Sequence, residues 1–106
     1  MAKMLEVRSP FDGHLIAKLE LEGADEIEKK LATAYQLSQN RDDAIPTPQR
    51  IEILEKTASF VEAKAEDLAR QAANEGGKPL TDSRIELARA VQGIREAARS
   101  INQLVG

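Results

Sequence analysis

The spacing of apolar residues changes at Gly23, and this change constrains the fold more than any other feature of the sequence. From residue 15 to residue 21, apolar and polar side chains alternate with one exception, Ile16, which is the period of a half-buried strand. Beyond Gly23, apolar residues recur at steps of three and four, which places them on one face of a helix. The pattern therefore predicts a mainly α chain with a short β-structure at its N-terminus.

Residues 5–22 are predicted to form a β-hairpin. Leu5 and Val7 alternate with charged residues, and residues 9–13 read Ser-Pro-Phe-Asp-Gly. Proline presets one turn dihedral and Asp-Gly accepts a positive one, so we expect a loop of four or five residues. Two strands alone cannot bury their apolar face, and the hairpin is therefore expected to need a partner surface.

Four helices are predicted to follow, over residues 24–39, 47–64, 65–75 and 81–105. Thr47 is expected to cap the second helix, with Pro48 at its first helical position. Gly76 and Gly77 are expected to end the third helix, and Pro79 prevents it from resuming.

Each long helix carries one predicted apolar stripe. The first stripe comprises Ile27, Leu31, Ala34 and Tyr35. The second comprises Ile51, Leu54, Ala58, Val61 and Ala65. The stripe of the last helix comprises Ile85, Ala88, Val91, Ile94, Ala98, Ile101 and Val105.

The composition predicts a thin core and excludes several kinds of chemistry. Of the 106 residues, 42% are hydrophobic, but 16 of these hydrophobic residues are alanines. The absence of cysteine removes disulfides, cysteine-ligated zinc and a thiol nucleophile, and a single histidine cannot build a multi-histidine metal site. The net charge is −3 and charges of both signs are mixed along the chain. The sequence therefore shows no basic face, and no nucleic-acid partner is expected. No apolar run approaches the roughly 18 residues of a membrane span, and the predicted location is the cytoplasm.

Two isolated basic residues suggest binding or catalysis, but a structural role is expected for both. Lys78 follows two glycines and could approach a phosphate, yet the glycines follow a helix rather than a strand, as a nucleotide-binding loop would require. We interpret the segment as a helix stop with a solvated lysine. No motif in the sequence marks His14 as a catalytic base, and a surface or interface position is expected.

The acidic and arginine-rich stretches are also expected to be structural. Asp42 and Asp43, with Glu52 further on, lack the regular ligand spacing of a cation site and are interpreted as a solvated linker. The last helix carries four arginines that do not form one stripe, although they could offer a phosphate-binding face: Arg84, Arg89, Arg95 and Arg99. Arg95 and Arg99 are neighbours on the helix, and Arg84 and Arg89 are expected to be solvated or to pair with Glu86 and Glu96. No residue is predicted to be catalytic, cofactor-binding or metal-binding.

Three stretches in this order resemble the N-terminal segment of the aldehyde dehydrogenase superfamily. Residues 9–17, Ser-Pro-Phe-Asp-Gly-His-Leu-Ile-Ala, are similar to its opening Asn/Ser-Pro-x-x-Gly turn and the strand that follows. Residues 50–54, Arg-Ile-Glu-Ile-Leu, match its Arg-x-x-Ile-Leu, and residues 75–80, Glu-Gly-Gly-Lys-Pro-Leu, resemble its Glu-x-Gly-Lys-Pro turn. Residues 84–90 are similar to a helix found in branches that oxidise small phosphorylated or carboxylated aldehydes.

The resemblance implies the N-terminal part of an α/β dehydrogenase fold, and an activity that belongs to a longer parent protein. In this family a thiolate attacks the aldehyde, hydride passes to NAD or NADP, and water activated by a glutamate releases the acid. The family's Rossmann sheet, nucleophilic cysteine and glutamate base map onto no position of this chain. Residues 1–106 are therefore expected to be a single partial domain, a catalytically inactive scaffold without a cofactor site of its own.

An alternative interpretation is an independent helical module for interaction or oligomerisation. Its partner would be the remainder of the dehydrogenase body or a second copy of the chain. A small stand-alone enzyme conflicts with the missing nucleophile, metal ligands and phosphate loop.

Overall fold

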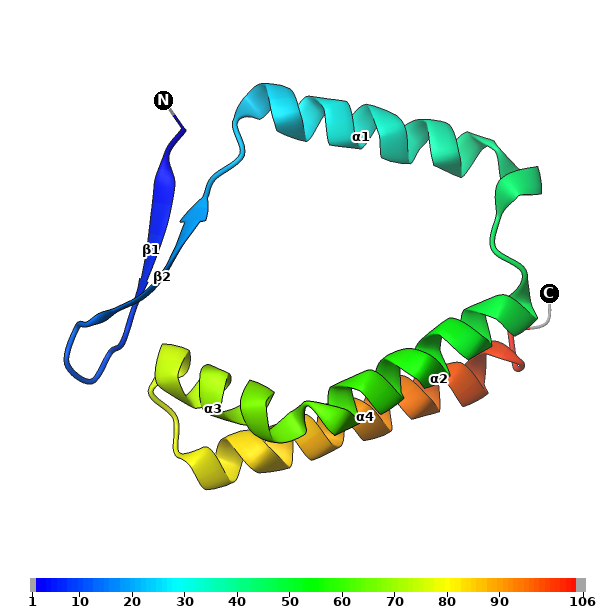
Figure 1. The fold of residues 1–106 in the computed structure, drawn as a ribbon. Coiled ribbons are helices and arrows are strands. Elements are labelled where there is room, and N and C mark those ends of the chain that lie inside the picture. Colours follow the sequence, from blue (N-terminus) through cyan, green and yellow to red (C-terminus); the bar gives the residue numbers. More distant parts are fainter. Residues whose placement is uncertain (1, 105–106) are drawn as a thin grey trace. The chain divides into compact units, whose positions relative to one another are not determined.

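The computed structural model describes residues 2–104, which divide into two compact units (Figure 1). Within the described residues, unit 1 comprises residues 2–8 and 13–44, and unit 2 comprises residues 9–12 and 45–104. The element order confirms the predicted hairpin followed by four helices. That residues 1–106 act as one partial domain stays a prediction.

The hairpin of unit 1 pairs β1 (Met4–Arg8) with β2 (Leu15–Glu20) in antiparallel register. Leu5 lies opposite Leu19 and Val7 opposite Ala17, so these apolar residues share one face of the ribbon. The partners on the other face include Glu6 and Lys18.

A register shift between Val7 and Arg8 explains the irregular alternation in the sequence. Arg8 pairs with Leu15 whereas Val7 pairs with Ala17, so Ile16 is one residue extra on β2, as in a β-bulge. The apolar face that the alternation predicts for this strand therefore ends at Ala17. The loop between the strands spans residues 9–14, one residue more than the longest loop predicted, because regular pairing stops at Arg8.

Unit 1 continues with α1 (Ala24–Gln39) and the short 3-10 helix η1 (Arg41–Asp43). The bounds of α1 equal the predicted ones. No residue of α1 is buried, and its stripe residues Ile27, Leu31 and Tyr35 are 49%, 57% and 66% exposed. The amphipathic pattern therefore forms a helix whose apolar face is largely uncovered.

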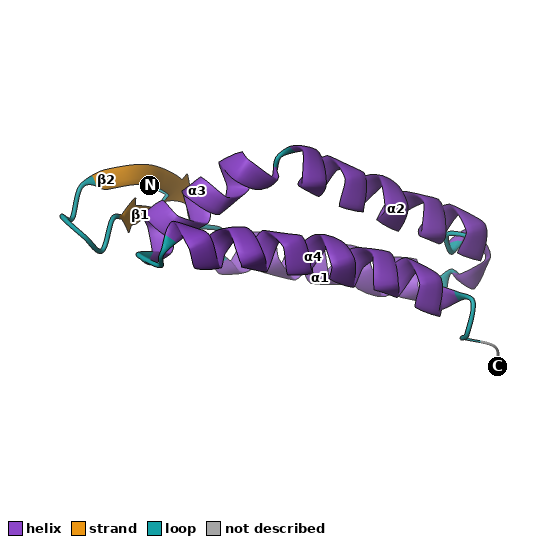
Figure 2. Cartoon of the chain, turned by 90° about the horizontal axis from the view of Figure 1, so that it is seen from below, coloured by secondary structure: helices purple, strands orange, loops and turns teal. Residues whose placement is uncertain are grey.

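Unit 2 packs α4 (Leu80–Ile101) antiparallel against α2 (Thr47–Ala63) and α3 (Ala65–Gly76) (Figures 1 and 2). The sequence predicts a break between α2 and α3 with the second helix ending at residue 64, and in the structure α2 ends one residue earlier, with Lys64 between the two helices. The buried core consists of small side chains, Ala58, Ala69, Val91, Ala98 and Ser83. The alanine content thus produces a thin core through close helix approach, as expected.

Two predicted helix features are wrong. The carbonyl of Pro46 accepts the first helical hydrogen bond, from the Arg50 amide at 3.0 Å, so Thr47 is already helical and its side chain does not cap α2. The last helix ends at Ile101 rather than at residue 105, which lies outside the described residues. There the Gln103 amide bonds back three residues to the Ser100 carbonyl, which tightens and ends the last turn.

The predicted stripe of the last helix is correct only in its C-terminal half. Val91 and Ala98 are buried, and Ile94 and Ile101 are half-buried, but Ile85 and Ala88 are exposed. In the N-terminal half the inward face comprises Leu80, Ser83 and Leu87. The predicted stripe left out all three, among them Ser83, whose hydroxyl has a partner inside unit 2.

Candidate functional site

The link between α3 and α4 is built around Gly77. This residue has a φ of +71°, and its amide donates to the Ala73 carbonyl at 2.8 Å, which closes the C-terminus of α3. A Cβ at this position would lie 2.7 Å from Cγ of Pro10, in the turn that belongs to the same unit. Both the backbone angle and the contact with Pro10 therefore favour glycine.

Lys78, the candidate phosphate ligand, forms an ion pair instead. Its Nζ lies 2.6 Å from Oε2 of Glu86, two turns into α4. This ion pair connects the link between α3 and α4 to a side chain of α4. The structure thus favours the helix-stop interpretation of the Gly-Gly-Lys-Pro segment.

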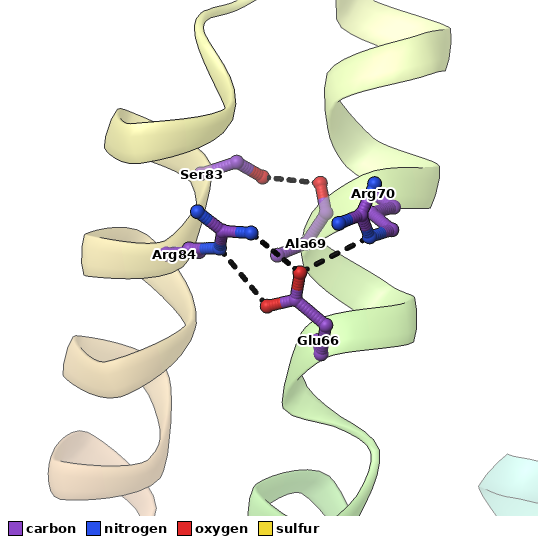
Figure 3. A network of polar contacts seen from close by, with 5 residues as sticks. All are labelled: Glu66, Ala69, Arg70, Ser83 and Arg84. Atoms are coloured by element: carbon purple, nitrogen blue, oxygen red, sulfur yellow. Dashed lines mark hydrogen bonds and ion pairs between the residues drawn. The ribbon is translucent and has the colours of Figure 1, made fainter.

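The most connected polar group in unit 2 centres on Glu66 (Figure 3). Arg84 donates to both carboxylate oxygens, at 2.9 and 2.7 Å, and Arg70 donates to one of them at 3.0 Å. The hydrogen bonds from Arg84 lower the pKa of Glu66, and the same contact raises the pKa of Arg84. This network joins α3 to α4 with a defined geometry.

Ser83 lies beside this network and was missed by the sequence reasoning. It is fully buried, and its hydroxyl donates to the Ala69 carbonyl on α3 at 2.7 Å (Figure 3). Its position four residues before Leu87 is the signal that could have placed it on the inward face. The residue fixes the approach of the two helices and does not face solvent, so it is no nucleophile for an external substrate.

The four arginines of α4 do not converge on one site. Arg95 pairs with Glu62 of α2 at 2.8 Å, and Glu96, one of the two partners predicted for Arg84 and Arg89, pairs with Arg99 at 3.2 Å. Glu86, the other predicted partner, pairs with Lys78. Arg89 lines an open hollow with Asp82, Ile85 and Glu86.

The remaining sequence candidates belong to separate elements of the chain. His14 stands exposed in the loop that follows Gly13. Asp43 in η1 accepts a hydrogen bond from Asn40, and Glu52 on α2 pairs with Lys56 at 2.9 Å. Within residues 2–104 there is no group of three or more His, Cys, Asp or Glu residues that could hold a metal ion. Over the same residues, the structure contains no helix with the length and apolar content to cross a membrane.

A dinucleotide does not fit the only glycine pair of the chain. Dinucleotide-binding loops connect a strand to a helix and turn backbone amides toward the pyrophosphate. Here Gly76 and Gly77 end helix α3, where the free backbone groups are carbonyls, and Lys78 is held by Glu86. The Gly-Gly-Lys segment therefore ends a helix and does not form a phosphate-binding loop of this kind.

Comparison with known proteins identifies the family. The pattern of the aldehyde dehydrogenase family matches residues 1–106, and the chain belongs to this family. It is 32% identical to an aldehyde-dehydrogenase-like protein of Sinorhizobium fredii, over 95% of this chain and 20% of that protein. It is 30% identical to a sulfoacetaldehyde dehydrogenase of Neptuniibacter caesariensis, over 100% of this chain and 23% of the other.

A solved structure shows the same fold within a longer chain. Glyceraldehyde-3-phosphate dehydrogenase of Methanocaldococcus jannaschii, complexed with NADP, matches 99% of this chain with a TM-score of 0.88 and 24% identity. The match covers 23% of that enzyme. The 106-residue chain therefore spans about a fifth of the length of the curated relatives described above, and its fold is that of an N-terminal segment of an aldehyde dehydrogenase.

Proposed function

We propose that residues 1–106 are the N-terminal scaffold of an NAD(P)-dependent aldehyde dehydrogenase that oxidises an aldehyde to a carboxylic acid. The observation that carries the proposal is the family match over the whole chain, together with relatives about five times as long. The solved enzyme of the same fold is complexed with NADP, which supports a nicotinamide coenzyme in the parent protein. A cytoplasmic location belongs to the same proposal.

The contribution of these residues to that enzyme is structural. The sequence has no cysteine to act as the nucleophile, and its glycine pair does not suit a dinucleotide. The ion pairs of Glu66, Glu62 and Lys78 hold helices together instead. We therefore expect the isolated chain to be inactive and to bind neither NAD nor NADP.

The proposed substrate is a small anionic aldehyde. One relative is named as a dehydrogenase of sulfoacetaldehyde, a short aldehyde with a negative charge. Residues 84–90 are also similar to the helix of branches that oxidise small phosphorylated or carboxylated aldehydes.

Assay of the longer parent protein with NAD, NADP and a panel of aldehydes tests this function. Coenzyme reduction is expected with at least one small anionic aldehyde, and no reduction with any aldehyde would contradict the proposal. Titration calorimetry of the 106-residue chain with NAD and NADP provides a second test. Binding in the micromolar range would overturn its role as a scaffold without a coenzyme site.

A second candidate function is an interaction or oligomerisation module, favoured by the exposed apolar residues of unit 1. Light scattering coupled to size-exclusion chromatography separates the two. A stable oligomer of the isolated chain would favour the module, and a monomer would favour the scaffold.

A further inference from the structure

We propose that Asp12, in the loop of the hairpin, is a site of spontaneous chemical modification, at which the aspartate cyclises onto Gly13 to a succinimide and reopens as isoaspartate. The loop spans residues 9–14, between β1 and β2. Asp12 is the only aspartate in the sequence that precedes a glycine. The inference is independent of the proposed dehydrogenase function, because the reaction needs no coenzyme and no reactant other than water.

The reaction joins two groups that are neighbours in the chain. The backbone nitrogen of Gly13 attacks the side-chain carboxyl carbon of Asp12 in its protonated form. A carbon–nitrogen bond forms, the carbon–hydroxyl bond breaks, and the hydroxyl leaves as water with the proton of the Gly13 amide. Water then adds to one of the two imide carbonyls. Opening at the side-chain carbonyl restores aspartate, and opening at the main-chain carbonyl leaves the chain running through Cβ as isoaspartate, with the original mass.

Gly13 leaves its nitrogen open to this attack. Glycine has no side chain beside the nitrogen, and the space around its Cα is empty as well, because a Cβ built there would have nothing within 4 Å. Its φ of +77° lies in the left-handed region that glycine adopts without steric cost. The same glycine that the turn favours therefore makes the preceding aspartate reactive.

The loop keeps the reacting pair at the surface. Asp12 and Gly13 are exposed, and their backbone lies outside the regular pairing of β1 with β2. Two hydrogen bonds hold the rest of the loop: the Phe11 amide donates to the Ser9 hydroxyl at 3.2 Å, and Arg8 donates to the Gly13 carbonyl at 3.0 Å. Neither bond involves the Gly13 nitrogen, which is the attacking atom.

The other aspartates lack this combination of an exposed loop and a following glycine. Three lie in the first turns of helices and precede residues with side chains: Asp25, Asp67 and Asp82. Asp43 in η1 is exposed like Asp12, but it precedes Ala44, whose Cβ lies beside the attacking nitrogen. Asp43 is therefore the internal control for the effect of glycine.

Isoaspartate would alter the hairpin at its loop. The main chain gains one atom between residues 12 and 13, and the Gly13 carbonyl is displaced from the Arg8 guanidinium that it now contacts. Loop length and turn geometry set the register of a hairpin. The modification would thus act on the pairing of β1 with β2.

Ageing of the purified 106-residue chain tests the proposal. After incubation at mildly acidic and at neutral pH, trypsin releases residues 9–18, which contain Asp12, and residues 42–50, which contain Asp43. Liquid chromatography with electron-transfer fragmentation measures isoaspartate at each position. A synthetic peptide of residues 9–18, aged in the same way, gives the rate in the absence of the fold. Asp12→Glu is the matched variant, because it keeps the carboxylate but would have to close a larger ring.

We expect isoaspartate to form at Asp12 at least several-fold faster than at Asp43, at a rate close to that of the free peptide. Asp12→Glu should abolish the isomerised form of the peptide 9–18. Equal rates at Asp12 and Asp43 would refute the proposal, since glycine would then give no advantage. A rate far below that of the free peptide would refute it as well, since the fold would then protect the loop. The readout involves neither aldehyde nor coenzyme, so it is distinguishable from failure of the proposed function.

Discussion

Helices α1 and α4 have similar amphipathic sequences but different surroundings. Both carry apolar residues at helical spacing and acidic residues in the first turn. α4 buries Ser83, Val91 and Ala98 within unit 2, while α1 buries no residue. The comparison shows that an amphipathic pattern indicates an apolar face, but not whether the same chain buries it.

The largest difference between the two helices is expected for a charge placed in each apolar face. Val91 is 4% exposed, so Val91→Asp puts an unpaired carboxylate into the core and should destabilise unit 2 by at least about 3 kcal/mol. Ala90→Asp, on the exposed neighbour, is the control and should cost less than about 1 kcal/mol. Urea unfolding followed by circular dichroism measures the stability of both variants. Similar unfolding midpoints would mean that Val91 does not lie in a buried core.

Gly77→Ala tests the closure of α3 in unit 2. It is expected to cost about 1–2 kcal/mol, because a side chain disfavours the positive φ, and its Cβ would meet Pro10 as well. Gly76→Ala is the matched control, since its Cβ would be in ordinary contact with Lys78 at 3.5 Å. A double variant with Pro10→Ala separates the contact from the backbone angle; full recovery of stability would assign the whole loss to Pro10.

Ser83→Ala removes the buried hydrogen bond between α4 and α3. The expected loss is about 1 kcal/mol, the usual contribution of a neutral hydrogen bond. Thermal or urea unfolding of the 106-residue chain gives this value. A variant as stable as the original would show that close packing at this position, and not the hydroxyl, holds the helices.

The Glu66 network predicts a small pH dependence in unit 2. Because its folded pKa lies below the ordinary 4.5, Glu66 contributes stability above about that pH, and the contribution is lost as the pH falls through the folded pKa. Glu66→Gln should therefore flatten the acid limb of the stability curve without changing the curve's shape near neutrality. If the variant has an unchanged acid limb, the ionised Glu66 carboxylate is not stabilised by Arg84 and Arg70.

The smallest effect is expected in unit 1. Leu31→Lys in the isolated chain should change the free energy of unfolding by less than about 0.5 kcal/mol, because Leu31 is 57% exposed. A cost comparable to that of Val91→Asp in the same urea titration would contradict the difference between the helices.

Local sequence signals predicted most of the fold. The bounds of α1 and, to within a residue, the break between α2 and α3 followed from apolar periodicity, and the closure at Gly77 followed from glycine chemistry. The family resemblance, and not the spacing of apolar residues, indicated that the chain is an N-terminal segment of a dehydrogenase.

The errors have two physical origins, a local hydrogen bond at a helix start and contacts between helices that a local pattern does not encode. Thr47 does not cap α2, because the Pro46 carbonyl accepts the first helical hydrogen bond and the helix begins one residue earlier. Ser83 lay on the inward face because the Ala69 carbonyl, 14 residues away, accepts its hydroxyl. Glu66 was unmarked in the sequence, since its partner Arg84 lies on another helix.

Amide hydrogen exchange of the isolated 106-residue chain tests the central claim, that unit 2 buries a core of its own whereas α1 in unit 1 does not. The account predicts that the central amides of α4, around Val91, exchange slowly, and that those of α1, around Leu31, exchange orders of magnitude faster. Equal protection of the two helices in a monomeric chain would contradict it.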